Sequence, residues 1–471
     1  MSPEAADAAS DVATLAATAM TRGFADRQLS PVQVAQAVLD RIERLDPVLN
    51  AFCLVDRPAA IEQARASERR WSARTPLGPL DGVPLSVKDL LPVQGWPTRR
   101  GSRATSDEPA RQDAPSVAKL RAAGAVLVGK TTTAEFGWKP LSDCPLTGTT
   151  RNPWDLTRTS GGSSGGSGAA VAAGLGPLSL GTDAAGSVRI PAAFCGLVAI
   201  KATRGSVPAA TSPFGLVAQT GPMTRNLLDA ATALAVLTGD DGLMEAVRDA
   251  CPADVEDLRV ALCTRMGHPL PIDPEVEGSV RAAADSLDAL GAHVSEVDPP
   301  SGDLIEDLTV LWSVALATMV EGWPRGRLAL LEPGLQDQVE RGRSVPGTRL
   351  LRAQMAADAA RLRLDEFFGS VDVLLTPTVP VPAFSLGADV PPSWPHSTWT
   401  SWTPFTFPFN LSGHPAISLP CGVTQGGLPV GLQLVACRHA DAQLLRWGAA
   451  FDLTQPGRSI PEPDVGRLRR V

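Results

Sequence analysis

The sequence is poor in the side chains that most often mark a catalytic or binding centre. Among its 471 residues there is no tyrosine, and histidine occurs only five times. No tyrosine can therefore act in catalysis, and a histidine base has few candidate positions. The seven cysteines are scattered and form no C-x-x-C pair, which argues against a disulfide framework or a zinc site. We expect reduced thiols in a cytoplasmic protein and no bound metal.

Long apolar runs and clusters of basic residues are also lacking. No stretch reaches the roughly 18 apolar residues that a membrane-spanning helix needs. The N-terminal sequence MSPEAADAASD does not have the basic and apolar layout of a signal peptide. A formal net charge of −8 without any Lys/Arg run argues against nucleic-acid binding. We therefore expect a soluble monomer or homodimer with neither a membrane nor a nucleic-acid partner.

Helical and strand-like segments alternate along the chain, and 44% of the residues are hydrophobic, enough for a large core. Ser30 and Pro31 begin a helix that we expect Pro47 to end. The segment DGVPLSVKDLL (81–91) predicts a turn and then a buried strand that carries Lys88. A short helix over 115–124 precedes a strand over 125–128. This alternation is typical of an α/β sheet.

The simplest domain organisation is a single unit over 1–471. It would consist of an N-terminal helical segment (about 1–50), a core (about 51–240 and 370–455) and a subregion of βαβ-like and helical character (about 241–369). In the subregion and the second part of the core we expect strands at 258–263, 292–297 and 371–376, a helix from Asp273-Pro274 to Leu290-Gly291, a helix near 347–368, and a strand pair around Gly426-Gly427.

The segment 159–203 is unusually rich in glycine, serine and alanine: TSGGSSGGSGAAVAAGLGPLSLGTDAAGSVRIPAAFCGLVAIKAT. A flexible linker would have such a composition, but here apolar helix-like and strand-like runs follow directly. Glycine allows backbone N–H groups to turn toward a ligand, and serines in the same loop supply nucleophiles. Acyl transfer needs N–H donors about 2.7–3.1 Å from the developing oxyanion. The segment therefore offers a nucleophile and an oxyanion hole together.

A serine nucleophile needs a base, and no histidine lies near this segment in the sequence. Lys88 is the better candidate because it stands on an apolar strand, where a lysine must be paired or neutral. From the strand alone, pairing with the neighbouring Asp89 or with a surface residue is the more ordinary interpretation.

Motifs along most of the chain, from about residue 30 to 450, closely resemble those of the amidase signature family. They are DGVPLSVKD (81–89), the Gly/Ser segment, TGPMTRNLLDAATAL (220–234), VDVLLTPTVPVPA (371–383), NLSGHPAISLPCG (410–422) and GLPVGLQLVA (427–436). The resemblance implies a three-layer α/β/α sandwich around a large mixed central sheet. It also implies hydrolysis of a C–N bond without any cofactor.

The resemblance assigns roles to individual residues. It implies that Lys88 is the base, Ser163 a relay in a cis peptide, and Ser187 the nucleophile. Ser163 lies 75 residues after Lys88 and 24 residues before Ser187, spacings that match the family pattern. The oxyanion hole would be formed by backbone N–H groups of Ala184, Ala185, Gly186 and Ser187. Supporting roles fall to Ser164, Asp183 and Arg189.

The chain departs from the family pattern immediately before the nucleophile. Two glycines usually stand there, but this chain has Ala185 followed by Gly186. If position 185 requires a positive φ, alanine costs on the order of 1 kcal/mol. We therefore expect that the geometry of the oxyanion hole is where this site differs from other members of the family.

The proposed base must be neutral to accept a proton. A free lysine has a pKa of about 10.4, so that only about one in 2,500 is neutral at pH 7. Lowering this pKa to 7 corresponds to about 4.6 kcal/mol, and full burial can lower a lysine pKa by about 3–5 pH units. The requirement is demanding but within the reach of a buried site.

Two short motifs point to other chemistry. Gly124 to Thr131 matches the phosphate-binding pattern GxxxxGK[ST], but its intervening residues form the expected strand itself, where a phosphate loop needs a flexible turn. Gly161 to Gly165 matches the GxSxG elbow of α/β-hydrolases, but the polar stretch 157–160 is not expected to form the strand that leads into such an elbow. We disfavour both interpretations.

The substrate is indicated only by aromatic side chains. Phe136, Trp138, Trp399, Trp402 and Phe405 are candidates for an apolar pocket, although packing in the core explains them equally well. We expect a small amide or carbamate (urethane) substrate with an apolar or aromatic group. The alternative is a glutamine amidotransferase component of the same family, which would pass ammonia to a partner.

Overall fold

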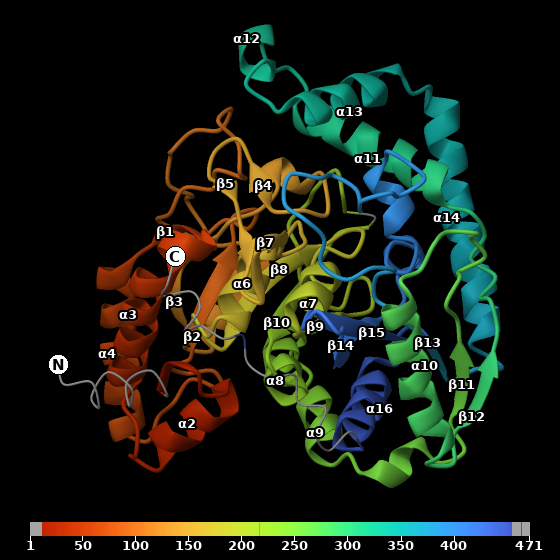
Figure 1. Ribbon diagram of the computed structural model, residues 1–471. Helices are drawn as coiled ribbons and strands as arrows, with labels where there is room; N and C mark the ends of the chain where they lie inside the picture. The colour runs from red at the N-terminus through yellow and green to blue at the C-terminus, as the bar shows by residue number, and fades with distance from the viewer. Residues whose placement is uncertain (1–11, 216, 455–462, 464–471) are drawn as a thin grey trace.

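The computed structural model describes residues 12–215, 217–454 and 463, and it is built around one mixed sheet (Figure 1). Over the described residues this sheet has 11 strands. In spatial order they are β1 (Phe52–Val55), β3 (Val126–Thr131), β2 (Pro84–Lys88), β8 (Leu178–Asp183), β10 (Gln219–Thr224), β9 (Val198–Lys201), β14 (Ala416–Val423), β15 (Pro429–Ala436), β13 (Val373–Pro377), β11 (Arg259–Leu262) and β12 (His293–Glu296).

Strand direction explains where the site is formed. Strands β3, β2 and β8 run parallel, as do β13, β11 and β12, whereas β8, β10, β9, β14, β15 and β13 pair successively as antiparallel neighbours. Val87 of β2 is level with Leu180 of β8. Lys88 and Asp183 therefore end neighbouring parallel strands at the same edge of the sheet, where active sites of open α/β sheets are found.

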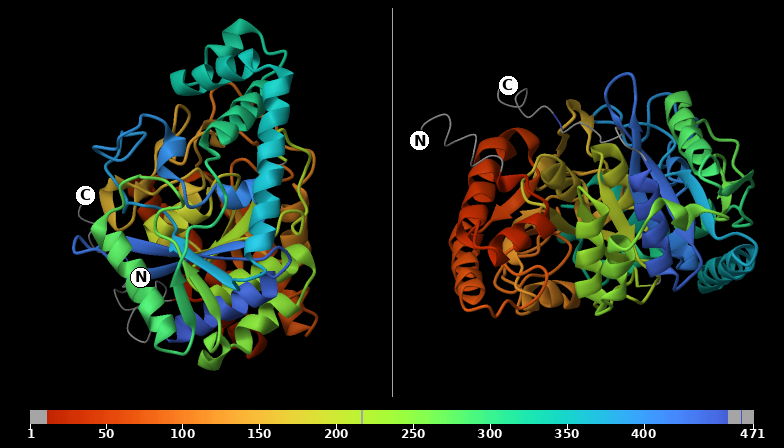
Figure 2. Two further views of the ribbon diagram at one scale, coloured as in Figure 1. Left: turned by 90° about the vertical axis from the view of Figure 1, so that its right-hand side faces the viewer. Right: turned by 90° about the horizontal axis from the view of Figure 1, so that it is seen from below.

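Helices cover both faces, which gives the expected three-layer sandwich (Figure 2). One face packs against α5 (Pro115–Ala122), α8 (Leu227–Thr238), α10 (Pro274–Asp288) and α16 (Asp441–Leu453). The other packs against α3 (Pro31–Leu49), α4 (Arg57–Ser72), α6 (Gly165–Ala172), α7 (Arg189–Cys195) and α14 (Gly347–Phe367).

The remaining elements are peripheral or short. The helices are α2 (Ala17–Ala25), α9 (Gly242–Arg248), α11 (Ile305–Met319), α12 (Arg325–Leu328), α13 (Pro333–Ser344) and α15 (Pro408–Ser412), with 3-10 turns at Glu135–Gly137, Pro252–Val255 and Trp399–Trp402. Two small sheets pair β4 (Asp143–Cys144) with β5 (Gly148–Thr149) and β6 (Arg151–Asn152) with β7 (Asp155–Thr159). Helices α12 and α13 project beyond the sheet beside one end of α14 (Figure 2).

Local sequence explains most boundaries, but Pro47 does not end α3. The Ser30 hydroxyl accepts hydrogen bonds from the N–H groups of Val32 and Gln33 and so caps the first turn. Pro47 lies inside the helix, which continues to Leu49 and stops at Asn50 in the left-handed conformation. A proline in the last turn removes one helical hydrogen bond without forcing the next two residues out of the helix.

Both strands of the βαβ-like unit, β11 and β12, extend the central sheet at its edge. The division into segments remains a prediction, and residues 1–11, 216 and 455 of its expected ranges lie outside the described residues. Within the described ranges, no helix combines the length and apolar character that crossing a membrane requires.

The structure also tests the two disfavoured motifs. Strand β3 includes Gly129 and Lys130, and Lys130 is buried in an ion pair with Asp89, so this stretch forms no phosphate loop. The expectation that no strand precedes Gly161 was wrong, because β7 ends at Thr159. However, β7 pairs only with β6 outside the central sheet, whereas a hydrolase elbow follows a strand of the main sheet.

Candidate active site

Strand β2 delivers Lys88 into the interior beside Ser163. The lysine is fully buried, and its Nζ lies 2.7 Å from Ser163 Oγ and 2.9 Å from Thr182 Oγ1. The neighbouring Asp89 does not pair with it, because that carboxylate binds Lys130 at 2.6 Å. Burial lowers the pKa of Lys88 well below its usual range, while the negative charge of Asp183 opposes this to a smaller extent.

The segment around Ser163 lies directly against the loop that carries Ser187. The Gly162–Ser163 peptide bond is cis. The Ser164 N–H donates to the Ser187 carbonyl at 3.2 Å, and the Ser164 hydroxyl donates to the Thr182 carbonyl at 3.2 Å. Two serines and one lysine from three separate segments are thereby brought together, each of them buried.

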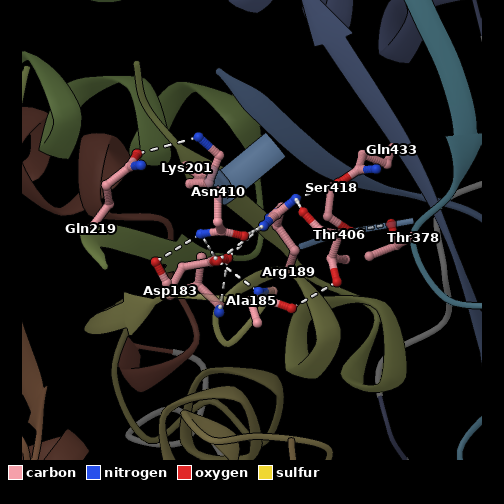
Figure 3. A network of polar contacts seen from close by, with 12 residues as sticks. Asp183, Ala185, Arg189, Lys201, Gln219, Thr378, Thr406, Asn410, Ser418 and Gln433 are labelled. Carbon is pink, nitrogen blue, oxygen red and sulfur yellow. Dashed lines mark hydrogen bonds and ion pairs between the residues drawn. The ribbon is translucent and has the colours of Figure 1, made fainter. Parts of the chain in front are cut away.

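A buried ion pair holds the loop between β8 and α7 (Figure 3). Arg189 donates from Nε and one terminal nitrogen to the two carboxylate oxygens of Asp183, each at 2.9 Å. Burial alone would raise the pKa of Asp183, but Arg189 and a hydrogen bond from Asn410 hold it below its usual range. Polar atoms of a buried ion pair need hydrogen-bond partners, and breaking any of these bonds is costly. The hydrogen bonds around Asp183 and Arg189 therefore hold the loop in one conformation.

The expected cost at Ala185 does not arise. The positive φ in this loop, +115°, falls on Gly186, and Ala185 is not among the described non-glycine residues with positive φ. The Gly186 N–H donates to Asp183 Oδ1 at 2.7 Å. Among the described residues there is no hydrogen-bond acceptor for the N–H groups of Ala184, Ala185 and Ser187.

Comparison with known proteins identifies the family of the chain. A family model described as Amidase matches residues 33–445. The chain belongs to the amidase signature family. An acylamidase of Rhodococcus erythropolis is 36% identical and aligns over 94% of this chain and 96% of its own length. In Symbiobacterium thermophilum, the A component of glutamyl-tRNA(Gln) amidotransferase is also 36% identical, over 93% of this chain and 96% of its own length.

Solved structures of amidase signature enzymes share the fold. A 6-aminohexanoate cyclic dimer hydrolase superposes with a TM-score of 0.86 at 30% identity, covering 96% of this chain and 99% of that one. A bacterial aryl acylamidase of the amidase signature family superposes with a TM-score of 0.87 at 27% identity, covering 95% and 98%. By family the chain is therefore an amidohydrolase with an α/β fold.

Sequence reasoning missed a group of residues that reaches this loop from far along the chain. Asn410 donates to the Asp183 carboxylate at 2.8 Å and accepts from Arg189, and Gln433 accepts from Arg189 at 2.7 Å (Figure 3). Thr406 donates to the Ala185 carbonyl at 2.7 Å. The sequence signals were that Asn410 begins one family motif and that Gln433 lies in another (427–436), which located these segments but not their contacts.

Another buried lysine, Lys201, lies at the other side of the same network. Lys201 ends β9, and its Nζ donates to the Ala202 carbonyl and to Gln219 Oε1 (Figure 3). Burial, assisted by the positive charge of Arg189, lowers the pKa of Lys201 to about 7. Any titration of activity near neutral pH must therefore be assigned among Lys88, Lys201 and Glu332, because burial raises the pKa of Glu332 to about 7.

The histidine best placed inside the molecule does not serve this site. His414 is fully buried, with Nδ1 at 2.9 Å from the Ser412 hydroxyl and Nε2 at 3.3 Å from Asp365. Burial lowers the pKa of His414 to about 3. Its contacts resemble a Ser–His–Asp series, but Ser412 is also fully buried, so a substrate has no access to it.

The candidate pocket aromatics separate into two groups. Trp402 is fully buried between Phe194 and Phe384, and Phe405 packs in a different cluster against the sheet, so both have the surroundings of core residues. Trp138 and Trp399 line a pocket of about 160 Å³. Phe136 belongs to the same apolar cluster as these two, with its ring edge-on to Trp323.

The pocket has a third tryptophan that the sequence did not single out. Trp312 of α11 lies edge-on to Trp399 with ring centroids 5.1 Å apart, and its N–H donates to the Trp138 carbonyl at 2.9 Å. A Cβ placed on Gly137 would lie 3.2 Å from Ser163 Oγ, so the backbone next to Trp138 abuts the serine beside Lys88. The pocket and the Lys88–Ser163 pair are therefore linked through residues 137 and 138.

Proposed function

We propose that the chain hydrolyses a C–N bond of a small amide or carbamate, with Lys88 as base, Ser163 as relay and Ser187 as nucleophile. The observation that carries the proposal is the 2.7 Å contact between the buried Lys88 Nζ and Ser163 Oγ. No carboxylate in the described part of the chain lies within ion-pair distance of Lys88. A buried lysine in that position is stabilised in its neutral form, which is the form that accepts a proton.

The steps follow from this arrangement. Neutral Lys88 takes the proton of Ser163 while Ser163 takes that of Ser187, whose oxygen forms a bond to the carbonyl carbon. The N–H groups of Ala184, Ala185 and Ser187 stabilise the oxyanion. The proton returns through Ser163 to the nitrogen as the C–N bond breaks, because an amide anion is a poor leaving group. Water then attacks the ester on Ser187 and releases the acid.

The tryptophan-lined pocket supports an apolar or aromatic group on the substrate. Trp138, Trp312 and Trp399 present large apolar surfaces, and Lys139, Asp337 and Arg341 add charged groups to the lining. Pockets of this kind bind small organic ligands through apolar walls and a few oriented polar groups.

A hydrolysis panel tests the substrate class. The purified chain should cleave 4-nitroanilides and aryl carbamates with apolar acyl groups faster than acetamide or glutamine, as measured by kcat/KM. Activity restricted to primary amides such as acetamide and glutamine would contradict the apolar substrate.

Replacing Trp399 tests the pocket directly. We expect Trp399→Ala to raise KM for an aryl substrate by about 10-fold, because loss of an aromatic contact costs about 1.4 kcal/mol. Trp447→Ala provides the matched control, since Trp447 packs against the cluster on the opposite face of the sheet. Equal KM values for the two variants on the aryl substrate would remove the pocket from the proposal.

The similarity to glutamyl-tRNA(Gln) amidotransferases supports a second candidate, release of ammonia from glutamine for a partner. The relative from Symbiobacterium thermophilum is as similar as the acylamidase. The purified chain distinguishes the two: hydrolysis of aryl amides without any added partner protein favours the hydrolase. Glutaminase activity that appears only with partner proteins would favour the amidotransferase.

A further inference from the structure

One peptide group of the nucleophile loop is held at both ends by side chains. The carbonyl of Ala185 and the N–H of Gly186 belong to the same planar unit. The carbonyl accepts a hydrogen bond from Thr406 Oγ1 at 2.7 Å, and the N–H donates to Asp183 Oδ1 at 2.7 Å (Figure 3). The plane of this peptide can therefore not rotate without breaking one of two buried hydrogen bonds.

We propose that Thr406 is a positioning residue for the oxyanion hole, because its hydroxyl fixes the 185–186 peptide directly before Ser187. The inference rests on the proposed role of Ser187. Rotation of this peptide changes ψ of Ala185 and φ of Gly186, and it thereby changes the angle between the N–H groups of Ala185 and Ser187. These two groups are donors that the Asp183 contact leaves free.

Steric fit around Gly186 supports a specific contact over incidental packing. A Cβ on Gly186 would lie 2.5 Å from Thr406 Oγ1, and the φ of Gly186 is +115°. Only glycine satisfies both constraints. The glycine thus allows the hydroxyl to approach the Ala185 carbonyl closely.

The choice of acceptor also points to the loop. The Thr406 hydroxyl has one proton to donate, and two carbonyl oxygens lie within hydrogen-bond distance of Oγ1. The Ala185 carbonyl is at 2.7 Å and the Thr403 carbonyl at 3.2 Å. The shorter contact is the one to the nucleophile loop. Without it the Ala185 carbonyl, which is buried, would lose the partner that the structure gives it.

Thr406 further connects the loop to the substrate pocket. It belongs to the segment that begins with the turn Trp399–Trp402, and Trp399 lines the pocket. Its backbone carbonyl accepts from Arg189 at 3.1 Å, so the segment is anchored to the Asp183–Arg189 pair as well. The continuous segment 399–406 therefore contacts both the pocket and the loop directly before Ser187.

The test compares Thr406→Val with Thr406→Ser on the full chain. Valine keeps the shape and removes the donor, whereas serine keeps the donor. Because donors aimed at the oxyanion act on the transition state, we expect Thr406→Val to lower kcat by about 10- to 100-fold with KM within twofold. Thr406→Ser should stay within about threefold of wild type.

A matched control comes from the same segment. Thr403 is equally buried, and within the described part of the chain its hydroxyl hydrogen-bonds only to the Thr400 carbonyl, at 3.4 Å. Thr403→Val should leave kcat nearly unchanged. An aryl trifluoromethyl ketone, which forms a tetrahedral adduct with a nucleophilic serine, should bind Thr406→Val more weakly by the same factor as the loss in kcat.

The outcomes distinguish the role of Thr406 from that of Ser187. If Thr406→Val matches Thr403→Val in kcat and ketone affinity while Ser187→Ala is inactive, the role of Thr406 is wrong and that of Ser187 stands. If Ser187→Ala is active, the proposed function itself fails. Should Thr406→Val not fold, Thr406→Ala against Thr403→Ala gives the same comparison with the same decisive results.

Discussion

Ser187→Ala should lower kcat by at least about 10⁴-fold while leaving the fold intact. The variant removes the oxygen that we propose forms the ester intermediate, and losing the nucleophile of a serine hydrolase costs up to about 10⁶-fold in turnover. The side chain is small, so alanine leaves little space unfilled. Steady-state hydrolysis of an aryl amide measures the loss, and circular dichroism checks the fold.

Ser167→Ala is the matched control. Ser167 belongs to the same glycine- and serine-rich segment and is equally buried, but its hydroxyl bonds to Thr131 on the neighbouring strand. It should retain most activity. In addition, a fluorophosphonate probe should label Ser187 in the wild-type chain, as located by peptide mass spectrometry. Near-wild-type turnover by Ser187→Ala, or labelling at Ser163 alone, would show that the nucleophile is misassigned.

Lys88→Ala should abolish measurable turnover near neutral pH, and the wild-type rate should rise with pH. Protonated Lys88 cannot accept the Ser163 proton, so activity is absent below its pKa and present above it. Because burial lowers the pKa of Lys88, this rise should be centred well below the value of about 10.4 for a free lysine. A pH profile of kcat/KM with a slope of one on its acidic side would agree.

The variant Lys201→Met tests whether Lys88 or Lys201 causes the rise in rate with pH. The pKa of Lys201 is lowered to about 7, so it could titrate in the same range. Methionine keeps the length of the side chain without the charge. If Lys88 is the base, the midpoint of the pH profile stays nearly in place in Lys201→Met. A profile that becomes flat in Lys201→Met, or turnover that persists in Lys88→Ala, would contradict the role of Lys88.

Local pattern determined much of the fold. Hydrophobic strand residues predicted β2 and β13, Asp273-Pro274 predicted the start of α10, and the glycine pair at 426–427 predicted the β14–β15 hairpin. These features depend on neighbours in the chain, which a sequence displays. The two local errors were Pro47, which does not end α3, and β7, whose polar residues pair with β6 away from the core.

The site was predictable only where a motif contained it. Lys88, Ser163 and Ser187 each lie in a long family motif, so their assignment needed no knowledge of contacts. The aromatic pocket did not have such support. Trp402 and Phe405 look like Trp138 and Trp399 in the sequence, but packing places the first two in the core and the others at the pocket.

The sequence by itself determined that this protein is an α/β amidase signature enzyme with a glycine-rich loop around Ser187. Only the tertiary structure decided that Lys88 meets Ser163 while Asp89 binds Lys130, and that Thr406 and Asn410 hold the nucleophile loop. These contacts join segments that are far apart along the chain. They depend on strand order and packing, which bring distant residues together without leaving any periodic pattern in the sequence.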